Sequence, residues 1–316
     1  MANCHNLFTQ YNSNISIESK KKERLRKSKD HLISVIEKFF IDNYPDYKPQ
    51  FFIQGSYKMA TMIITKDNDC DLDLGVHFVL EPDIQPEALM KRVKKAVDGI
   101  TNASTQIKSK CVRVIYANDY HIDLPIYKQS EDDDYPWLAI KGEEWDTEES
   151  DPRGFVQWYR DTKTDQLTRL IKCLKCWCDK VGNKMPSGLA MTLLAEEHYD
   201  EDDRDDIALR DTLIAIENDI DSWEAYMPTK PEDNVLERYS ESLKDNFKEK
   251  LSSFIESAEE AIDEENQLKA SKKWRKHLGL RFPLGKDDDG GSRAVSSIAA
   301  ISSRSTTRPY LPNEKK

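Results

Sequence analysis

The sequence lacks the features that would mark a membrane protein, a disulfide-rich secreted protein or a protein that coats nucleic acid. It has no apolar run of about 18 residues and no signal-peptide pattern, so we expect a soluble, cytoplasmic protein without membrane contact. Its six cysteines, spread over 316 residues, form no disulfide framework. It also lacks excess positive charge: 47 basic against 58 acidic residues give a net charge of −11, which opposes binding to the phosphates of DNA or RNA.

The length and the composition along the chain favour two lobes and a tail. A chain of 316 residues suits two domains, and its hydrophobic content of 38% is enough for a sizeable core. We predict a first lobe over residues 1–160, a helical lobe over residues 161–285, and a disordered tail over residues 286–316, which has little to pack. Two segments dense in Asp and Glu, residues 128–154 and 201–206, are predicted to be exposed.

The first lobe is predicted to open with a frayed segment, residues 1–15, and a long helix over residues 15–43, whose apolar side chains recur at the spacing of one buried face. The first half of this helix carries a run of basic residues between Lys20 and Lys29. The run has two interpretations, a contact with duplex nucleic acid or a solvated helix face. The acidic net charge and the lack of interleaved aromatic residues favour the solvated face, so nucleic acid is not an expected partner.

The strongest chemical signal is a pair of carboxylates in a predicted strand. Asp71 and Asp73 alternate there with apolar residues: Leu72, Leu74 and Val76. A period of two is typical of a strand with one buried face, so both carboxylates share the other face, roughly 7 Å apart along the strand. Two carboxylates about 5 Å apart repel by roughly 3 kcal/mol at an effective dielectric constant near 20. A cation between them would remove that cost, and Mg²⁺ prefers carboxylate oxygens together with substrate phosphates.

Two further features favour a metal and phosphate site. Gly55 permits a close approach of the backbone, and the hydroxyl of Ser56 with neighbouring N–H groups can hold a phosphate. Asp123 alternates with apolar residues in a second β-rich run, so a third carboxylate projects from a mostly buried strand. Taken alone, the Asp71–Asp73 pair and Asp123 would each be better explained as part of a solvated strand face. Three acidic positions on neighbouring strands favour a two-metal site.

The second lobe offers two candidate phosphate ligands. Residues 166–181 are predicted to form a helix with an apolar stripe, and Lys175 lies at the rim of that stripe, where its ammonium group can reach a cleft. Ser187 precedes an apolar run and is a natural N-cap of the helix that follows. A helix N-terminus is also a phosphate site, so capping and phosphate binding can coexist at Ser187. A surface lysine and a plain cap remain the simpler alternatives.

Together these residues resemble the signature of the polymerase-β-like nucleotidyltransferases, which is Gly-Ser, then Asp-x-Asp, then a distant Asp. Within that superfamily the sequence most resembles the bacterial cyclic-oligonucleotide synthases related to cyclic GMP–AMP synthase and oligoadenylate synthase. The resemblance extends to the stretches RLIKCLKCW, PSGLAMTLLAEE and WRKHLGLRFP. It implies an α+β fold, in which a nucleotidyltransferase lobe with a mixed or antiparallel sheet meets a helical lobe, with the active site in the cleft between them.

The resemblance also implies an activity and its residues. NTPs, ATP among them, would be joined into a cyclic dinucleotide or trinucleotide with release of pyrophosphate, as a second messenger in bacterial antiphage signalling that involves defence-system regulatory proteins. Asp71, Asp73 and Asp123 would be the catalytic and metal-binding residues for two Mg²⁺ ions, for which Mn²⁺ could substitute. The nucleotide phosphates would be bound by Gly55, Ser56, Lys175 and Ser187.

Two other functions stay open at this point. One is a nucleotidyltransferase that modifies an RNA end, a protein or a small molecule without forming a ring. The other is a non-enzymatic module that binds duplexes through the basic run between Lys20 and Lys29. The identity of the bases, the type of phosphodiester link and the ring size are not specified by any of these residues.

Overall fold

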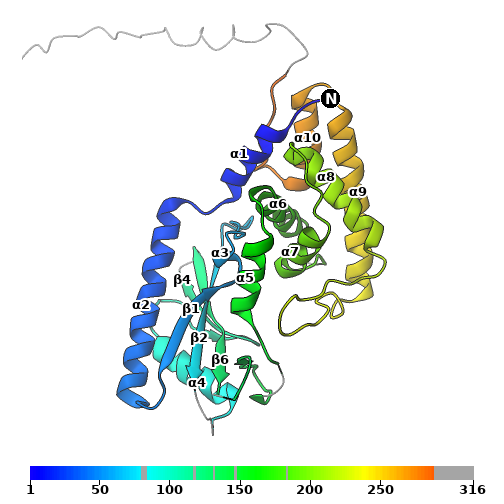
Figure 1. The fold of residues 1–316 in the computed structure, drawn as a ribbon. Coiled ribbons are helices and arrows are strands. Elements are labelled where there is room, and N and C mark those ends of the chain that lie inside the picture. Colours follow the sequence, from blue (N-terminus) through cyan, green and yellow to red (C-terminus); the bar gives the residue numbers. More distant parts are fainter. Residues whose placement is uncertain (80–83, 117–118, 131, 146–147, 183, 288–316) are drawn as a thin grey trace, which may run out of the picture.

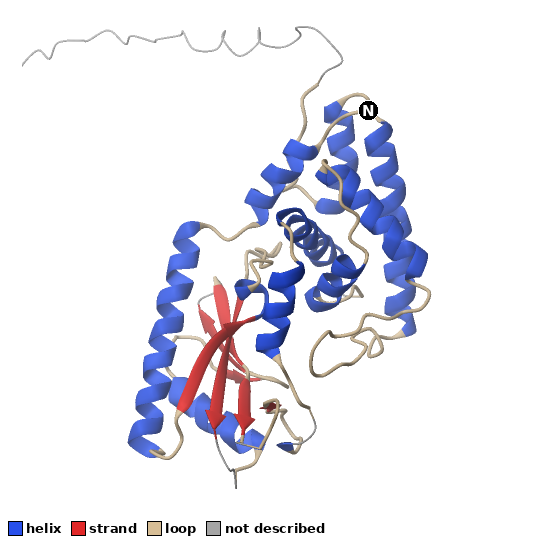
Figure 2. Ribbon diagram, viewed as in Figure 1, coloured by secondary structure: helices blue, strands red, loops and turns tan. Residues whose placement is uncertain are grey.

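The computed structural model describes residues 1–79, 84–116, 119–130, 132–145, 148–182 and 184–287. A sheet with its helices forms one part of the molecule, and a group of helices forms the other (Figures 1 and 2). This arrangement confirms the predicted α+β class. The predicted disorder of the tail falls on residues that lie almost entirely outside the described ranges, so it stays a prediction.

The sheet is mixed and is built around one central strand, β2 (Asp71–Val79). β2 pairs antiparallel with β1 (Pro49–Gln54) and parallel with both β5 (Tyr120–Leu124) and β6 (Ile126–Gln129). Pro125 separates β5 from β6, and its carbonyl oxygen still accepts a hydrogen bond of 2.9 Å from the backbone N–H of Val76. The remaining strands extend the sheet at its two sides: β3 (Gln106–Ile107), β4 (Val112–Tyr116) and β7 (Trp137–Leu138).

One face of the sheet packs against two helices, α2 (Ser19–Asn43) and α4 (Pro86–Val97). The apolar residues of β2 that alternate with its carboxylates are completely or almost completely buried there, which confirms the predicted period of two. We call this cluster the sheet core; its largest contributions come from Leu25, Leu32, Ile36, Phe40, Leu72, Leu74, Val76, Phe78, Leu89 and Val93. The opposite face of β2 carries Asp71 and Asp73, whose side chains therefore lie outside the sheet core.

The predicted frayed segment at the start of the chain is wrong. Residues 5–15 form helix α1 (His5–Ile15), and a short break at residues 16–18 separates it from α2, so the long helix predicted over residues 15–43 begins later. α1 buries Leu7, Phe8, Tyr11 and Ile15, and the hydroxyl of Tyr11 donates to the backbone oxygen of Leu278 at 2.8 Å. The intervening polar residues hide this stripe in the sequence, because only four of eleven positions are apolar and buried.

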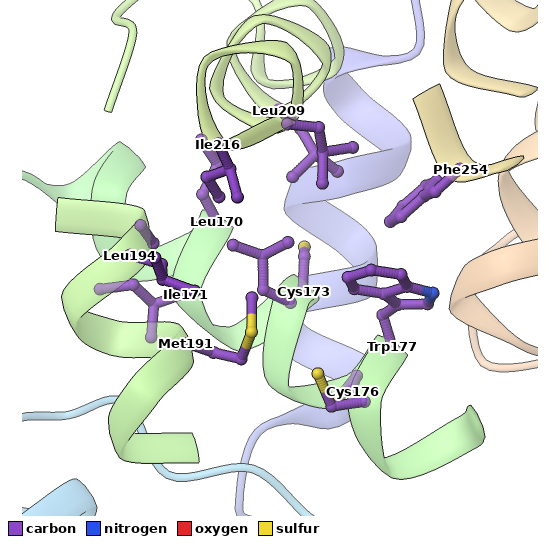
Figure 3. Packing of buried hydrophobic residues seen from close by; sticks show 14 of the residues in the cluster. Leu170, Ile171, Cys173, Cys176, Trp177, Met191, Leu194, Leu209, Ile216 and Phe254 are labelled. Carbon is purple, nitrogen blue, oxygen red and sulfur yellow. The ribbon is translucent and has the colours of Figure 1, made fainter. Parts of the chain in front are cut away.

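The helical part surrounds α6 (Asp165–Val181), which agrees with the helix predicted over residues 166–181. Figure 3 shows its stripe from close by, with Leu170, Ile171 and Trp177 pointing toward side chains of neighbouring helices. The other helices of this part are α5 (Pro152–Thr162), α7 (Gly188–Glu197), α8 (Asp205–Asp219), α9 (Glu241–Asp263) and α10 (Gln267–Leu278). Within the described residues, no helix is at once long and apolar enough to cross a membrane.

The buried side chains form two clusters, and these clusters do not separate at residue 160, the predicted boundary between the lobes. α1 and α5, which both begin before that residue, contribute to the same cluster as α6, α8 and α10. We call this cluster the helical core; it includes Phe8, Tyr11, Tyr159, Leu174, Trp177, Leu209, Phe254, Trp274 and Phe282. The chain thus starts in the helical part, crosses to the sheet through α2, and returns through α5. The boundary at residue 160 stays a prediction of domain organisation.

Three expectations about charged segments need correction. Asp205 and Asp206, expected in an exposed acidic patch, are completely buried. Within residues 128–154, the side chains of Leu138, Ala139 and Trp145 are buried, so the acidic insertion is only partly exposed. Lys21, expected on a solvated helix face, is 6% exposed, and its Nζ donates to the backbone oxygen of Asn68 at 2.7 Å.

Candidate active site

A row of polar side chains crosses one face of the sheet. The strand registers pair Arg113 of β4 with Asp123 of β5, Asp123 with Asp73 of β2, and Asp73 with Gln54 of β1. Directly paired residues point to the same side of a sheet, and neighbouring strands lie about 4.8 Å apart. Asp71 shares this face because it lies two residues before Asp73. The fold therefore brings together the three carboxylates that the sequence analysis selected. We call Asp71, Asp73 and Asp123 the carboxylate row.

The middle carboxylate of the row is strongly perturbed. Burial raises the pKa of Asp73 well above its ordinary value of 3.8, and the negative charges of Asp71 and Asp123 raise it further. Arg113 and Lys175 act in the opposite direction without cancelling the rise. Within the described part of the chain, neither Asp71 nor Asp73 forms an ion pair with a basic side chain. A charged group that is buried without a partner is costly, and a bound cation would compensate this one.

The Gly55–Ser56 turn lies directly against Asp73. Gly55 opens the short helix α3 (Gly55–Lys58) with a φ of +64°, a conformation that side chains disfavour. A Cβ atom at this position would lie 2.1 Å from Oδ2 of Asp73, which leaves no room for any other residue. The predicted reason for this glycine, a close backbone approach, is therefore visible in the geometry.

A cleft of about 940 Å³ opens in front of the carboxylate row. Its walls come from both parts of the molecule: Gly55, Ser56, Asp71 and Asp73 from the sheet part, and Lys175 and Gly188 from the helical part. Asp123 and Ser187 are not among the residues that line it. Five of the seven predicted site residues thus share one cleft, and the other two lie beside it.

Lys175 reaches across the boundary between the two parts. Its Nζ donates to the side-chain oxygen of Thr61 at 3.0 Å, next to the Gly55–Ser56 turn. Burial lowers the pKa of Lys175 to about 8, although the charges of Asp71 and Asp73 oppose that shift. Lys172, one turn earlier on α6, instead donates to the hydroxyl of Ser16 at 3.1 Å. The two lysines therefore have different hydrogen-bond partners, and of the two only Lys175 lines the cleft.

Ser187 caps helix α7. Its hydroxyl accepts a hydrogen bond of 3.3 Å from the backbone N–H of Ala190, which confirms the predicted N-cap. Its own backbone N–H donates to the hydroxyl of Tyr239 at 2.8 Å. The adjacent Gly188 lies close to the stem of Lys175, where a Cβ atom would be 3.3 Å from Cε. The start of α7 therefore supports Lys175 as well as bordering the cleft.

Sequence reasoning missed the partner of the third carboxylate. Nε and Nη2 of Arg113 donate to Oδ1 and Oδ2 of Asp123, each at 2.7 Å. A signal was present: Arg113 alternates with the buried Val112 and Val114, so it faces away from the sheet core. A hairpin between β4 and β5 then brings it opposite Asp123.

The carboxylate row fits a divalent cation. Its donor set consists of hard oxygen ligands, which suit Mg²⁺ or Mn²⁺ better than softer metals. Asp71 and Asp73 both line the cleft, so an ion in the cleft could reach their carboxylates. Asp71 and Asp73 have open lone pairs toward the cleft, whereas Asp123 shares both of its oxygens with Arg113.

Comparison with known proteins agrees with this geometry. Residues 49–127, which include Gly55, Ser56 and the whole carboxylate row, match the family model of the DncV-like cyclic GMP-AMP synthases, nucleotidyltransferase domain. A cyclic GMP-AMP synthase from Escherichia albertii is 24% identical over 196 residues, or 56% of this chain and 43% of that protein. The cyclic dinucleotide synthase CdnG of Bradyrhizobium diazoefficiens is 28% identical over 75 residues, or 23% of this chain and 18% of that protein. The chain spans less than half the length of these two relatives.

Solved structures extend the likeness to most of the chain. The Vibrio cholerae DncV cyclic AMP-GMP synthase superposes with a TM-score of 0.77 at 16% identity, covering 89% of this chain and 97% of the other. Its complex with the linear intermediate 5′ pppA(3′,5′)pG gives a TM-score of 0.78 and covers 90% and 99%. At this identity the likeness concerns the fold. Residues 49–127 are therefore similar to the nucleotidyltransferase domain of the DncV-like synthases, in agreement with the predicted resemblance, and the fold of most of the chain is that of the Vibrio cholerae protein.

Proposed function

We propose that this protein is a metal-dependent nucleotidyltransferase that joins NTPs into a cyclic dinucleotide or trinucleotide and releases pyrophosphate. The observation that carries the proposal is the position of Asp71 and Asp73 beside the Gly55–Ser56 turn, in a cleft of about 940 Å³. The relatives that match this chain are named as synthases of cyclic dinucleotides, which supports the nature of the product. The Vibrio cholerae protein is described with GTP and with a linear intermediate, which supports two successive joining steps.

The three carboxylates of the row would hold two Mg²⁺ ions, with Mn²⁺ as a substitute. When bound, such ions would stabilise the charge that develops on the attacking and leaving oxygens of the phosphoryl group. Asp71 and Asp73 would provide oxygens from the floor of the cleft, and Asp123 would provide the third carboxylate. The unpaired carboxylates of Asp71 and Asp73 support this assignment, because a bound cation would relieve their mutual repulsion.

The phosphates of the donor nucleotide would lie between the two parts of the molecule. The hydroxyl of Ser56 and the neighbouring backbone of the turn would hold them from the sheet side, because Gly55 and Ser56 both line the cleft. Lys175 would approach from the helical side, where its Nζ already lies 3.0 Å from the side-chain oxygen of Thr61. Ser187 would contribute through the N-terminus of α7, which it caps.

The chemical step would be an in-line displacement. The hydroxyl oxygen of one nucleotide forms a bond to the α-phosphorus of another, the bond from that phosphorus to the bridging oxygen breaks, and pyrophosphate leaves. Asp123 would orient the attacking hydroxyl and take up its proton. A second displacement between the ends of the linear product would close the ring. Positioning and charge stabilisation would supply most of the acceleration in such a reaction.

In the cell the product would act as a second messenger in antiphage defence, with the synthase in the cytoplasm and regulatory proteins of the defence system as its partners. ATP would be among the substrates. The resemblance to bacterial cyclic-oligonucleotide synthases supports this context.

Incubation with all four NTPs and Mg²⁺, followed by mass spectrometry, tests the proposal. We expect a product that resists phosphatase, because a ring has no terminal phosphate, and we expect no product in EDTA. A product that appears only after an RNA, protein or small-molecule acceptor is added would identify a non-cyclising transferase instead. Turnover that is unaffected by EDTA would reject the metal-dependent step.

A further inference from the structure

The three carboxylates of the row differ in what they contact. Asp71 and Asp73 line the cleft, whereas Asp123 does not. The side chain of Asp123 is 11% exposed and that of Arg113 is 30% exposed, so their ion pair is largely shielded from water. The pairing follows from the register of β4 and β5, which places the two residues directly opposite each other. The contact is therefore a built feature of the sheet.

The form of the contact limits what Asp123 can bind. A carboxylate offers about four lone-pair positions, and the guanidinium fork occupies one on each oxygen. The fork also fixes a positive charge beside the position where a cation would meet Asp123. That charge repels a divalent ion more strongly than it repels a monovalent one, and the shielding from water preserves the repulsion. Asp123 in this arrangement is a weakened metal ligand.

The same contact has a benefit for the protein without metal. The carboxylate row gathers three acidic side chains within two neighbouring strands, and ionising all of them together is costly. Arg113 offsets one of these charges and holds the Asp123 carboxylate in a single orientation. Removal of one member of such a pair leaves the other buried without compensation.

We propose that Arg113 is a counter-cation for Asp123, which holds this carboxylate in place before metal loading and keeps the metal affinity of the nucleotide-free site low. The inference rests on the metal-dependent function proposed above. A nucleoside triphosphate brings phosphate oxygens that can bind the metal. A metal that arrives with the nucleotide therefore depends less on binding to the Asp123 carboxylate. Metal loading is thereby coupled to nucleotide binding, and Arg113 acts as a positioning residue.

Direct measurement of Mn²⁺ binding by titration calorimetry tests the inference. Wild type, Arg113→Gln and Arg113→Lys are compared with and without a nonhydrolysable NTP. The matched control is Arg24→Gln, because Arg24 also pairs with an aspartate, Asp119 at 2.8 Å, but has a side chain that is 60% exposed, outside the cleft. It removes one positive charge from the protein without touching the carboxylate row.

Without nucleotide, Arg113→Gln should bind Mn²⁺ about tenfold more tightly than wild type, since the repelling charge and the fork are both lost. Arg113→Lys keeps the charge but loses the fork, so its affinity should rise by only about threefold. Arg24→Gln should match wild type. With nucleotide present, the difference between wild type and Arg113→Gln should shrink.

Unchanged or weaker Mn²⁺ binding by Arg113→Gln would overturn the inference, because Arg113 would then be neutral toward the metal or support it. If Arg113→Gln folds only in the presence of Mn²⁺, the counter-cation role is supported. If Arg113→Gln folds neither with nor without Mn²⁺, the test passes to Arg113→Lys, and an Mn²⁺ affinity of that variant equal to wild type overturns the inference. Failure of wild type to bind Mn²⁺ even with nucleotide would instead reject the proposed function, and the inference with it.

Discussion

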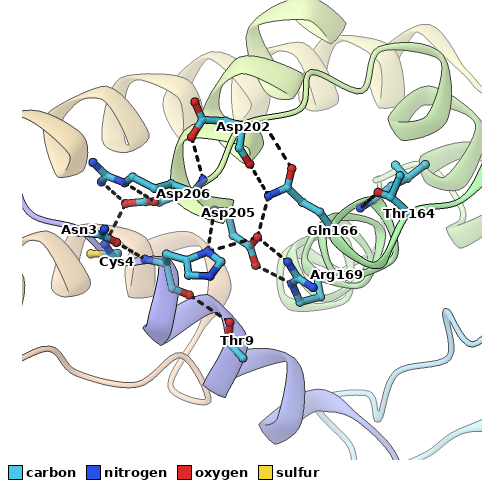
Figure 4. Close-up of polar contacts among 12 residues, drawn as sticks. Asn3, Cys4, Thr9, Thr164, Gln166, Arg169, Asp202, Asp205 and Asp206 are labelled. Atoms are coloured by element: carbon cyan, nitrogen blue, oxygen red, sulfur yellow. Dashed lines mark hydrogen bonds and ion pairs between the residues drawn. The ribbon is translucent and has the colours of Figure 1, made fainter.

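Two groups of carboxylates in this protein have opposite surroundings. Asp205 and Asp206, at the start of α8, are completely buried, and each pairs with an arginine through two hydrogen bonds (Figure 4). Arg169 donates to both oxygens of Asp205 at 2.6 and 2.7 Å. The backbone N–H of Cys4 donates to Asp206 at 2.9 Å, which ties the start of the chain to α8. We call Asp205, Asp206 and their two arginines the structural pairs.

The carboxylate row contains the contrasting case. Asp71 and Asp73 face a cleft and have no ion-pair partner within the described part of the chain. Buried charge that is compensated internally joins segments of a fold, whereas buried charge that is left uncompensated is retained where a ligand supplies the opposite charge. Asp123 lies between these cases, because it belongs to the row and yet carries an arginine. Asp71 and Asp73 thus differ from Asp205 and Asp206 both in their partners and in their exposure, because they are half-buried at the cleft and the other two are completely buried.

The largest expected effect comes from Asp71→Asn combined with Asp73→Asn. We expect product formation to fall by at least about 1,000-fold, because the positions that would hold metal lose their charge. The free energy of unfolding of the metal-free protein should not decrease, since the mutual repulsion of the two carboxylates is removed. Product analysis and thermal melting in EDTA measure the two quantities. Normal turnover by the double variant would reject the metal site.

The pH dependence of stability follows from the same contrast. The raised pKa of Asp73 means that the native state holds a proton which the unfolded state, with a pKa near 3.8, has lost. Between about pH 4 and the raised pKa, the free energy of unfolding of the metal-free protein should therefore fall as pH rises. Melting in EDTA across this range measures it. Asp73→Asn should flatten the curve, and a curve of unchanged slope would contradict this origin.

Asp205→Asn should lower stability and leave activity unchanged, whereas the double variant of Asp71 and Asp73 should lose activity and keep its stability. The substitution leaves Arg169 without its charged partner beside a fully buried side chain, which costs about 3 kcal/mol of folding free energy. The activity of the molecules that remain folded should be unchanged, because Asp205 does not line the cleft. Chemical denaturation and turnover per folded molecule measure the two effects. A stable but inactive variant would show that the structural pairs take part in function.

The contrast also indicates how far sequence reasoning reaches. The alternation around Asp71 and Asp73 predicted both the strand and its buried face, because side chains that alternate with a period of two match the geometry of a strand and not that of a helix. The cap at Ser187 and the stripe of α6 were predictable for a related reason: they depend on neighbours in sequence. Asp205 and Asp206 were assigned to an exposed patch, because several of their partners come from distant segments; Arg169 lies 36 residues from Asp205. Cys4, for example, lies 202 residues from Asp206.

The burial of α1 and of Lys21 was not predicted for the same reason, namely that their partners come from distant parts of the chain. The stripe of α1 contains only a few apolar residues, and it is buried by distant segments: α6, α8 and the rings of Trp274 and Phe282. Lys21 belongs to a basic run that looks solvated, yet its partner Asn68 lies 47 residues further on. Local patterns predict which face of an element is apolar. They do not predict which polar groups of that element will meet a partner from another part of the chain.

Lys175 and Lys172 provide a test within one helix. If Lys175 contacts the donor triphosphate, Lys175→Ala should lower kcat/KM for NTPs by roughly 10- to 150-fold, the value of a charge-assisted contact of about 1.5–3 kcal/mol. Lys172→Ala should have little effect, because its Nζ binds Ser16 outside the cleft. Steady-state kinetics at several NTP concentrations distinguish the two. Equal losses in both variants would mean that α6 acts through its overall charge.

The smallest effect is expected at the basic run, in which four of the seven basic residues form ion pairs with acidic residues. Lys21 and Arg24 both pair with Asp119, and Lys27 pairs with Glu23 at 2.8 Å. Recognition of a duplex requires several unpaired positive charges at once and a steep salt dependence, with log K falling by about 0.9 per phosphate per log unit of salt.

We therefore expect constitutive activity in vitro that neither double-stranded DNA nor double-stranded RNA changes. Reversal of the exposed Lys20, Lys22 and Arg26 to Glu should leave turnover within about twofold, because none of them lines the cleft. Lys21 is excluded from this set, since Lys21→Glu would place a negative charge against the backbone oxygen of Asn68 and lower stability for a structural reason. Turnover with and without each duplex, at low and physiological salt, measures the effect. Strong stimulation by a duplex that disappears in the triple variant would show that the run is a sensor, and that local pairing of charges does not exclude a nucleic-acid surface here.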